Sequence, residues 1–385
     1  MKIRMLTFHT PKNHGAVLQA YALQTHLKKI CDDVKILNFC PSSLLKKYDL
    51  YFPATKSWFA FAKKCARLPF LLFWSHHYHR LRTSRKNFES FAARYFDLTE
   101  RYASLEEMEK KFPDCDIVIT GSDQIFNPER QPFEEHRAFY LDFDTRDALR
   151  ASYAGSFGVS TIPEHCKGRI ASFLNRFDAL SVREDSGKVF VETLTPKNAV
   201  VSLDPVFLLE KSEWEVLAQQ ANEKITGNIN RPYLLYYSLL NFKGSNEHVQ
   251  RIARQYGLEI VVISHSACLH IKADRVIRDA GPLEFLKLML NAEYIMTDSF
   301  HGTAFAILMK KPLNYYHEVE RRMLRSRQVL GYLGLGQRVI SPILSHTPDD
   351  SMMSYTKEIS DKLLSLRQRS MDYLNDLLEM RINNP

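Results

Sequence analysis

The segment around His301 combines residue types that can bind an anion and move a proton. Ala292–Met296 is an apolar run typical of a buried strand, and Gly302–Met309 is typical of a short apolar helix. Ser299, His301 and Gly302 would then lie at the start of that helix, where unpaired N–H groups and the helix dipole attract negative charge. A histidine there can add a charge, a hydrogen bond or a proton. The alternative is a capped core helix with an incidental surface histidine.

Two arginines are candidates for holding the same anion. Arg183 directly follows the apolar run Ala179–Val182, and its planar guanidinium can contact a carboxylate or phosphate through two hydrogen bonds. Arg327 ends the arginine-rich run Glu320–Arg327, downstream of the histidine helix, and is the arginine of that run that we favour. The alternatives are a salt bridge between Arg183 and the acidic residues beside it, and a solvated face for the arginine-rich run.

Other strand-like segments also end in polar residues. Asn13 and His14 follow the first predicted strand, and Asp123 and Asn127 follow the strand predicted at Asp116–Thr120. The carboxyl ends of parallel strands meet at one edge of an α/β sheet, where ligands bind. We therefore expect these residues to lie near one another. Ordinary turns, with Asp123 capping the next helix, are the alternative.

Apolar strand-like runs alternate with helical segments in two successive halves of the chain. This pattern predicts an α/β protein with two Rossmann-like βα domains that face a central cleft, an architecture of the GT-B type. The expected N-terminal domain covers residues 1–205 with an insertion at 44–94, and the expected C-terminal domain covers 206–345. Residues 346–385 are helical by pattern and are expected to pack back on the first domain.

The insertion at 44–94 is rich in basic and aromatic residues. It holds eleven lysines and arginines against two acidic residues, interleaved with aromatic residues such as Trp58, Phe59, Phe70 and Trp74. This mixture favours a segment that lies on an anionic bilayer surface. A nucleic-acid patch is a second interpretation, and a helical hairpin with solvated basic residues is a third.

Composition narrows the class of protein. The chain has 385 residues, of which 45% are hydrophobic, and a net charge of +8 that favours an acidic or phosphate-bearing partner. It has no uninterrupted apolar run of about 18 residues, and its N-terminus continues directly into a strand-like segment. We therefore expect a cytoplasmic protein. Six cysteines without a C-x-x-C pair predict neither a disulfide framework nor a zinc site.

Several nucleotide, hydrolase and metal motifs are missing from the sequence. There is no G-x-x-x-x-G-K-[ST] and no G-x-G-x-x-G after the first strand, which argues against a P-loop kinase and a dinucleotide-binding fold. There is also no G-x-S-x-G and no H-E-x-x-H. Metal catalysis therefore has no clear set of ligands.

Taken in order, six short motifs resemble the polysaccharide pyruvyl transferase family. They are N-H-G-A-V-L-Q-A-Y-A-L from Asn13, T-G-S-D-Q-I-F-N-P from Thr120, S-Y-A-G-S-F-G from Ser152, L-S-V-R-E-D-S-G from Leu180, L-D-P-V-F-L-L from Leu203 and T-D-S-F-H-G-T from Thr297. A run beginning at Ser326 is similar to the closing motif of that family. The resemblance covers roughly residues 1–340. It implies transfer of a pyruvyl group from phosphoenolpyruvate to two hydroxyls of one sugar, which gives a cyclic ketal and phosphate.

The resemblance also assigns roles to residues of this chain. Arg183 and His301 match positions used for donor binding and catalysis, and Asp123 is a candidate base. Some members of the family read R-x-H where this chain has Ser299-Phe300-His301. Either Arg327 or another basic residue supplies the missing charge, or Ser299 and backbone N–H groups bind the donor without it. The residues expected to bind phosphoenolpyruvate are Arg183, Ser299, His301, Gly302 and Arg327. The residues expected to bind the acceptor are Asn13, His14, Asp123 and Asn127.

Two other functions compete with this one. A glycosyltransferase of the same two-domain shape would use a nucleotide-sugar donor, and a non-catalytic module would bind a sugar or phosphate without turnover. Under the leading hypothesis the acceptor is a saccharide of a cell-surface polysaccharide or of its precursor, carried on a polyprenyl diphosphate at the inner membrane face. That scheme requires no metal or cofactor besides the donor substrate, and no nucleic acid partner.

Overall fold

The computed structural model describes residues 1–383 except 11, 42–67, 131–132, 228, 230, 241, 267–268, 319 and 342–353. For residues 68–76 and 320–323 it describes the backbone alone. Trp58 and Phe59 of the expected bilayer-binding insertion therefore lie outside the described residues.

The N-terminal half of the chain forms a parallel sheet covered by helices. Its strands are β1 (Lys2–Leu6), β2 (Asp33–Phe39), β3 (Leu98–Tyr102), β4 (Ile117–Thr120) and β5 (Leu149–Ser152), in the order β3-β2-β1-β4-β5. A parallel pair, β6 (Ser181–Val182) and β7 (Val200–Val201), continues this sheet through a bridge between Ala151 and Ala179. The central strands β1 and β4 are buried at every residue except Lys2, because helices cover both faces of the sheet.

The C-terminal half forms a second sheet of the same kind. Its strands are β8 (Tyr233–Tyr237), β9 (Glu259–Ile263), β10 (Arg275–Ile277), β11 (Tyr294–Thr297), β12 (Leu313–Tyr316) and β13 (Val339–Ile340), all parallel in the order β10-β9-β8-β11-β12-β13. In each sheet the strand order reverses beside the first strand, between β1 and β4 and between β8 and β11. Doubly wound sheets bind ligands at this reversal point.

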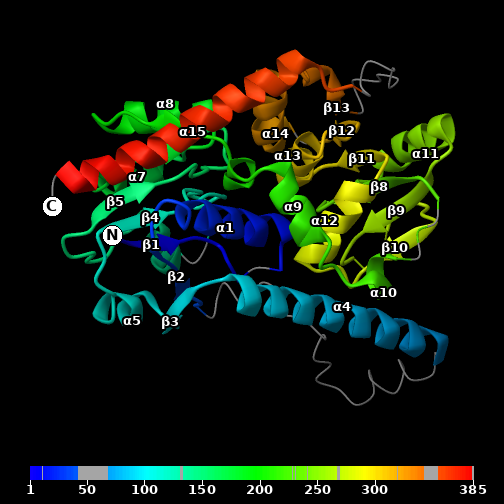
Figure 1. The fold of residues 1–385 in the computed structure, drawn as a ribbon, viewed down its shortest axis with the longest axis horizontal. Coiled ribbons are helices and arrows are strands. Elements are labelled where there is room, and N and C mark those ends of the chain that lie inside the picture. Colours follow the sequence, from blue (N-terminus) through cyan, green and yellow to red (C-terminus); the bar gives the residue numbers. More distant parts are fainter. Residues whose placement is uncertain are drawn as a thin grey trace.

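Helices connect and cover the strands (Figure 1). The longer ones are α1 (His14–Leu27), α4 (Leu68–Tyr95), α7 (Glu164–Leu174), α8 (Asp185–Leu194), α9 (Lys211–Ala218), α11 (Ser245–Tyr256), α12 (Pro282–Asn291), α13 (Phe300–Leu308), α14 (Glu320–Tyr332) and α15 (Lys357–Asn383). The short ones are α5 (Leu105–Lys110), α6 (Phe133–His136), α10 (Glu223–Thr226) and the 3-10 helices η1 (Arg137–Tyr140), η2 (Pro205–Leu208) and η3 (Gly336–Arg338). Among the helices that the structure describes, none has the length and apolar character required to cross a bilayer.

One hydrophobic core runs through both halves of the molecule. It joins residues of α1 and η2 from the first half to residues of α12 and α13 from the second. Trp214 of α9 is fully buried in it, edge-on to Phe305 of α13 at a centroid distance of 5.0 Å. Because this apolar contact is continuous, the two sheets are held against each other.

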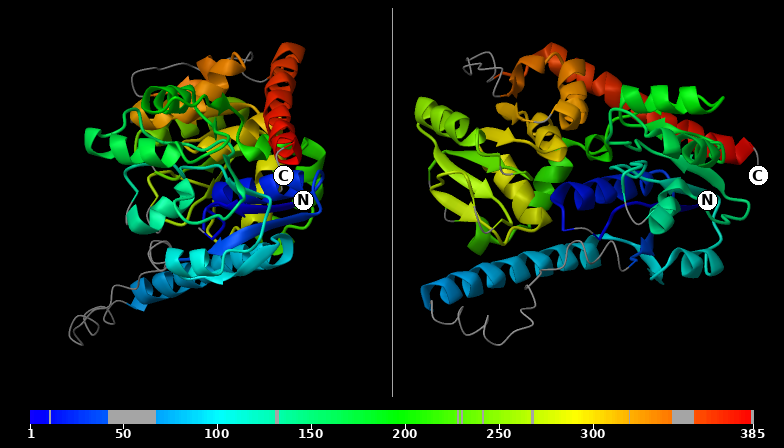
Figure 2. Two further views of the ribbon diagram at one scale, coloured as in Figure 1. Left: turned by 90° about the vertical axis from the view of Figure 1, so that its left-hand side faces the viewer. Right: turned by 180° about the vertical axis from the view of Figure 1, so that it is seen from behind.

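Helix α4 lies along one side of both sheets (Figures 1 and 2). Phe88 and Phe91 on it are buried in the shared core. Toward the second half, the Ser84 hydroxyl donates to Ala280 O at 2.8 Å and the Asn87 amide donates to Asp279 O at 2.9 Å. The described part of the basic-aromatic insertion therefore packs across the two halves.

Helix α15 crosses the opposite side of the molecule and returns to the first sheet (Figure 1). The Tyr373 hydroxyl donates to Ser152 O at 2.8 Å, at the end of β5, and Ser370 Oγ accepts the amide N–H of Leu203 at 2.9 Å. Leu374 and Leu377 are buried in the shared core.

Candidate active site

The loops after β1, β4, β8 and β11 meet between the two sheets and enclose a small cavity of about 130 Å³. Among the residues that line it are Asn13, Asp123, Arg130, Ser299, His301 and Arg325. A large cavity of about 530 Å³ adjoins it, and Arg130, Ser299 and Arg325 belong to the walls of both. The reversal points of both sheets therefore contribute to one continuous cleft.

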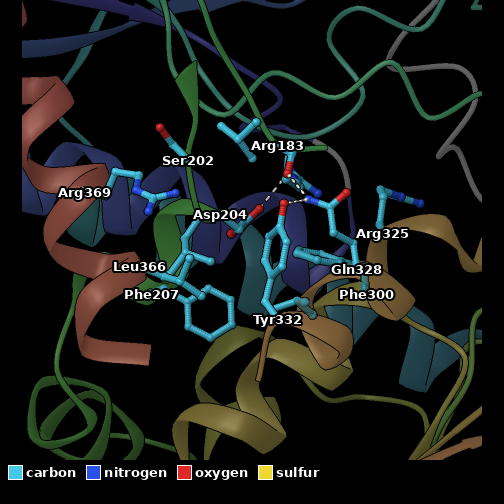
Figure 3. A pocket seen from close by; sticks show the side chains of 13 residues that line it. Arg183, Ser202, Asp204, Phe207, Phe300, Arg325, Gln328, Tyr332, Leu366 and Arg369 are labelled. Carbon is cyan, nitrogen blue, oxygen red and sulfur yellow. Dashed lines mark hydrogen bonds and ion pairs between the residues drawn. The ribbon is translucent and has the colours of Figure 1, made fainter. Parts of the chain in front are cut away.

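Asp204 joins the two leading site residues from the sequence. Its Oδ2 lies 2.8 Å from Arg183 Nη2 and 3.4 Å from His301 Nε2 (Figure 3 shows the Arg183 pair). The carboxylate is fully buried, and its Oδ1 accepts the N–H of Val206 at 3.1 Å. Burial raises the pKa of Asp204, but the adjacent Arg183 and His301 outweigh it and hold the pKa at about 2. Asp204 is therefore a fixed negative charge between an arginine and a histidine.

Arg183 has more hydrogen-bonding capacity than its neighbours use. Its Nη2 donates to Ser122 Oγ at 2.5 Å as well as to Asp204. Its Nε and Nη1 are buried and, among the described residues, find no hydrogen-bond partner. The guanidinium carbon lies 4.6 Å from the centre of the Phe300 ring. Buried donors are rarely left unpaired, so this arginine is suited to an anionic ligand.

Ser299 and His301 are fixed by the start of α13. The helix begins at Phe300, two residues before the start that the sequence predicted, and Ser299 caps it by accepting the Gly302 N–H at 3.4 Å. The backbone N–H groups of Phe300 and His301 lie in the first turn, where no carbonyl of the helix can accept them. Gly302 lines neither cavity. It faces Thr297 instead, since a Cβ on Gly302 would lie 2.3 Å from Thr297 Oγ1. Gly302 therefore permits close packing of α13 on β11.

Asp123 is a partly buried, ionised carboxylate in the small cavity. Its backbone has φ of 71°, an uncommon conformation for a residue with a side chain. Its Oδ1 accepts the N–H of Gln124 at 2.8 Å and lies 3.8 Å from Arg325 Nη1. Burial raises the pKa of Asp123, but the charges of Arg183, His301, Arg130 and Arg325 lower it below the usual value.

The structure brings Arg325 to the cleft, whereas the sequence favoured Arg327. Arg325 lines both cavities, and its guanidinium lies 5.9 Å from the centre of the Phe300 ring. Burial and the charge of Arg183 lower the pKa of Arg325. Arg327 is exposed and lines neither cavity. Two residues along a helix point about 200° apart, so only one of this pair can face the cleft.

The residues expected to bind the acceptor are divided between the cleft and the core. Asn13 lines the small cavity and caps α1 by accepting the Ala16 N–H at 3.2 Å. Asn127 lines the large cavity and donates to Gln124 Oε1 at 3.0 Å. His14 lies outside both cavities.

His14 belongs to the contact between the two halves. Its ring is 1% exposed and stacks on Phe285 at a centroid distance of 4.9 Å. Burial and the nearby His265 lower the pKa of His14 to about 3. A buried neutral imidazole of this kind packs the interface, and the structure gives it no access to the cleft.

Sequence reasoning missed Asp204, Arg130, Arg325 and Glu184 as site residues. Asp204 had a signal, because Asp204-Pro205 follows a strand and stands inside one of the family-like motifs. Glu184 is buried beside Arg183 and lines the large cavity, and burial raises the pKa of its carboxyl. For Arg130 no pattern in the sequence indicated that it faces the cleft. Among the described residues, no group of three His, Cys, Asp or Glu side chains is placed to hold a metal ion.

Solved structures with a similar arrangement include enzymes that act on nucleotide sugars. UDP-N-acetylglucosamine 2-epimerase from Rickettsia bellii is 10% identical, covers 100% of this chain and 97% of its own, and has a TM-score of 0.51. The Methanocaldococcus jannaschii UDP-GlcNAc 2-epimerase in complex with UDP-GlcNAc and UDP is 14% identical, covers 96% of this chain and 92% of its own, and has a TM-score of 0.48. The Escherichia coli ADP-heptose heptosyltransferase II is 11% identical, covers 99% of both chains and has a TM-score of 0.38.

The Rickettsia bellii match supports the predicted two-domain fold of the GT-B type and carries no statement about activity. Among curated proteins, none matches this chain significantly. The sequence model of a protein family, described as polysaccharide pyruvyl transferase, matches residues 13–314, which span most of the chain. The chain therefore belongs to the polysaccharide pyruvyl transferase family.

Proposed function

We propose that the protein transfers the pyruvyl group of phosphoenolpyruvate to two hydroxyls of one sugar in a polysaccharide or its precursor. The observation that carries this proposal is Arg183, which is buried with two unpaired guanidinium nitrogens and shares the Asp204 carboxylate with His301. Arg183 lines a pocket of about 30 Å³ that meets the small cavity at Phe300 and Arg325. Phosphoenolpyruvate carries a phosphate and a carboxylate, so it needs several cationic or N–H-rich contacts. Arg325, Arg130 and the start of α13 surround the small cavity and supply such contacts.

Arg325 is our proposal for the charge that an R-x-H pattern would otherwise provide. Ser299 occupies the first position of that pattern in this chain and caps α13. Arg325 reaches the same small cavity from α14 and lies near Asp123 at 3.8 Å. The donor would bind there, and the adjoining large cavity would take the saccharide acceptor.

The proposed chemistry needs one positioned acid and base. C3 of the donor takes up a proton while the first sugar hydroxyl bonds to C2 and loses its own proton. The second hydroxyl then bonds to C2 as the C2–O bond to phosphate breaks, and its proton passes to the departing phosphate, which leaves the cyclic ketal and free phosphate. We assign proton transfer to His301 and orientation of the attacking hydroxyl to Asp123, whose lowered pKa makes it a weak base.

The experiment that tests this function is phosphate release from phosphoenolpyruvate with a panel of galactose-, mannose- and glucose-containing glycans. We expect turnover with at least one glycan and a loss on the order of 100-fold or more in His301→Ala. Arg183→Ala should also lose activity, with folding checked by circular dichroism because Arg183 pairs with Asp204. Heat of binding from a UDP- or GDP-sugar, with none from phosphoenolpyruvate, would instead identify a nucleotide-sugar glycosyltransferase.

We further propose that the basic-aromatic insertion at residues 44–94 contacts an anionic bilayer and that the acceptor is lipid-linked. The support is the excess of basic and aromatic residues between 44 and 94. Sedimentation with anionic vesicles should exceed that with neutral vesicles, and a variant with Trp58, Phe59, Phe70 and Trp74 changed to Ser should lose the difference. If that variant binds vesicles and uses a lipid-linked acceptor as well as the wild type does, the proposed contact of the insertion with the bilayer is wrong.

A further inference from the structure

His301 is carried by the second half of the molecule but enclosed by the first. Its ring is 6% exposed, in the turn where α13 packs against α1 and η2. Gly15 of α1 and Asp204, which caps η2, approach it from two directions. The surroundings of this imidazole therefore depend on how the two halves meet.

Gly15 lies directly against the ring. A Cβ built on Gly15 would be 2.1 Å from His301 Nδ1 and 2.2 Å from its Cγ. Real Cβ atoms essentially never come closer than about 3.0 Å to another atom. Every residue other than glycine would therefore force the imidazole, or the whole of α13, to move away.

Asp204 faces the other side of the imidazole. Its Oδ2 lies 3.4 Å from His301 Nε2, close enough for an ion pair although not aligned as a hydrogen bond. The carboxylate cannot turn freely, because Val206 N–H, Ser122 Oγ and Arg183 Nη2 all hold it. A fixed carboxylate next to one ring nitrogen favours the ring orientation that turns this nitrogen toward it.

We infer that Gly15 and Asp204 form a cradle, supplied by the N-terminal half, that fixes the orientation of the His301 imidazole in the cleft. This inference rests on the proposed function for the statement that His301 is catalytic. Gly15 and Asp204 are positioning residues in it, since they act through His301. A displacement of about 1 Å at a reacting group can lower a rate by about 100-fold. The contact between the two halves therefore sets the activity of the histidine.

Gly15→Ala provides the cleaner test, because it removes no charge and no hydrogen bond. Its matched control is Gly168→Ala in α7, where an added Cβ meets nothing within 4 Å. We expect kcat for phosphate release to fall on the order of 100-fold in Gly15→Ala, while KM for phosphoenolpyruvate changes less than about threefold. Gly168→Ala should match the wild type in both constants.

The state of the ring itself should be read by NMR of protein labelled with ¹⁵N-histidine, with the His301 signals assigned from the His301→Ala spectrum. We expect the ring nitrogen shifts of His301 to move in Gly15→Ala and in Asp204→Asn. They should return toward the wild-type values in Asp204→Glu, which restores the carboxylate. Asp178→Asn is the control for loss of a carboxylate, because Asp178 accepts the Arg150 N–H away from the cleft.

Unchanged His301 signals and an unchanged kcat in Gly15→Ala, in a protein that melts as a folded unit, would overturn the cradle. The spectra answer this question even if phosphoenolpyruvate is not the donor. Absence of turnover in the wild type with moved signals in both variants would reject the proposed function and retain the cradle.

Discussion

At the residue scale, Arg325 and Arg327 form a natural pair of test sites on α14. Arg325 lines both cavities, and Arg327 is exposed and lines neither. We expect Arg325→Ala to raise KM for phosphoenolpyruvate and lower kcat/KM about 10- to 100-fold, the effect of losing a charged hydrogen bond of about 1.5–3 kcal/mol. Arg327→Ala should leave both constants unchanged. Steady-state phosphate release measures this, and a larger loss in Arg327→Ala would reject our assignment.

Residue types and their order along the chain were enough to predict part of the cleft. Asn13, Asp123, Ser299 and His301 each follow a strand, and the carboxyl ends of parallel strands meet, so these residues converge. The phase of α14 was not predictable from a run in which four of eight residues are arginine. The apolar residues after the run, such as Val329 and Leu330, are buried and do mark the inward face.

The direction of a side chain at a helix start was harder still to predict. Asn13 and His14 are adjacent in the sequence, yet Asn13 lines the small cavity and His14 stacks on Phe285 in the interface. Both residue types are common in loops that bind ligands. Only the position of α12 from the other half of the chain decides which one is buried, and that position is set by tertiary packing.

At the element scale, α4 should stabilise the fold through its buried aromatic face. Phe91 is 2% exposed and packs against Tyr95, Phe96 and Tyr21. We expect Phe91→Ala to lower the free energy of unfolding by about 3–5 kcal/mol, because it removes a buried ring and leaves a cavity. Lys86→Ala on the exposed face of the same helix should change it by less than about 0.5 kcal/mol. Urea unfolding at equilibrium measures the free energy of unfolding of both variants. A change in Phe91→Ala as small as that in Lys86→Ala would show that α4 contributes no core packing.

The alternation of strands and helices could be predicted from apolar periodicity, and the parallel sheets followed from it. The position of α4 across the two halves could not be predicted in this way. Aromatic and basic residues at helical spacing look alike whether the apolar face meets a bilayer or another domain. Phe88 and Phe91 are buried in the shared core, and Ser84 and Asn87 beside them donate to residues 196 and 192 positions away in the sequence. A pattern read along one segment does not contain that partner.

At the scale of the whole molecule, burial of neutral histidines should make the fold sensitive to acid. His14 and His136 are each at most 3% exposed. For His136, burial and the charge of Arg130 lower the pKa to about 3, and for His14 burial and His265 lower the pKa to about 3. The unfolded chain, with a histidine pKa of about 6.5, binds more protons than the folded chain between these values. The contribution of these two histidines to the free energy of unfolding is therefore fully present above about pH 6.5 and is lost as the pH falls toward 3.

The variant His136→Phe tests this at one site, because it keeps a ring among Phe8, Phe139 and Tyr140 but cannot take up a proton. Each such histidine costs about 1.4 kcal/mol per pH unit below 6.5, or about 2 kcal/mol between pH 6.5 and 5. We expect the free energy of unfolding of His136→Phe to fall about 2 kcal/mol less over that interval than that of the wild type. His165 lies on α7 with its ring exposed, and the free energy of unfolding of His165→Phe should fall as much over this interval as that of the wild type. If the free energy of unfolding of His136→Phe falls as much as that of the wild type, the imidazole of His136 is not held neutral by the fold.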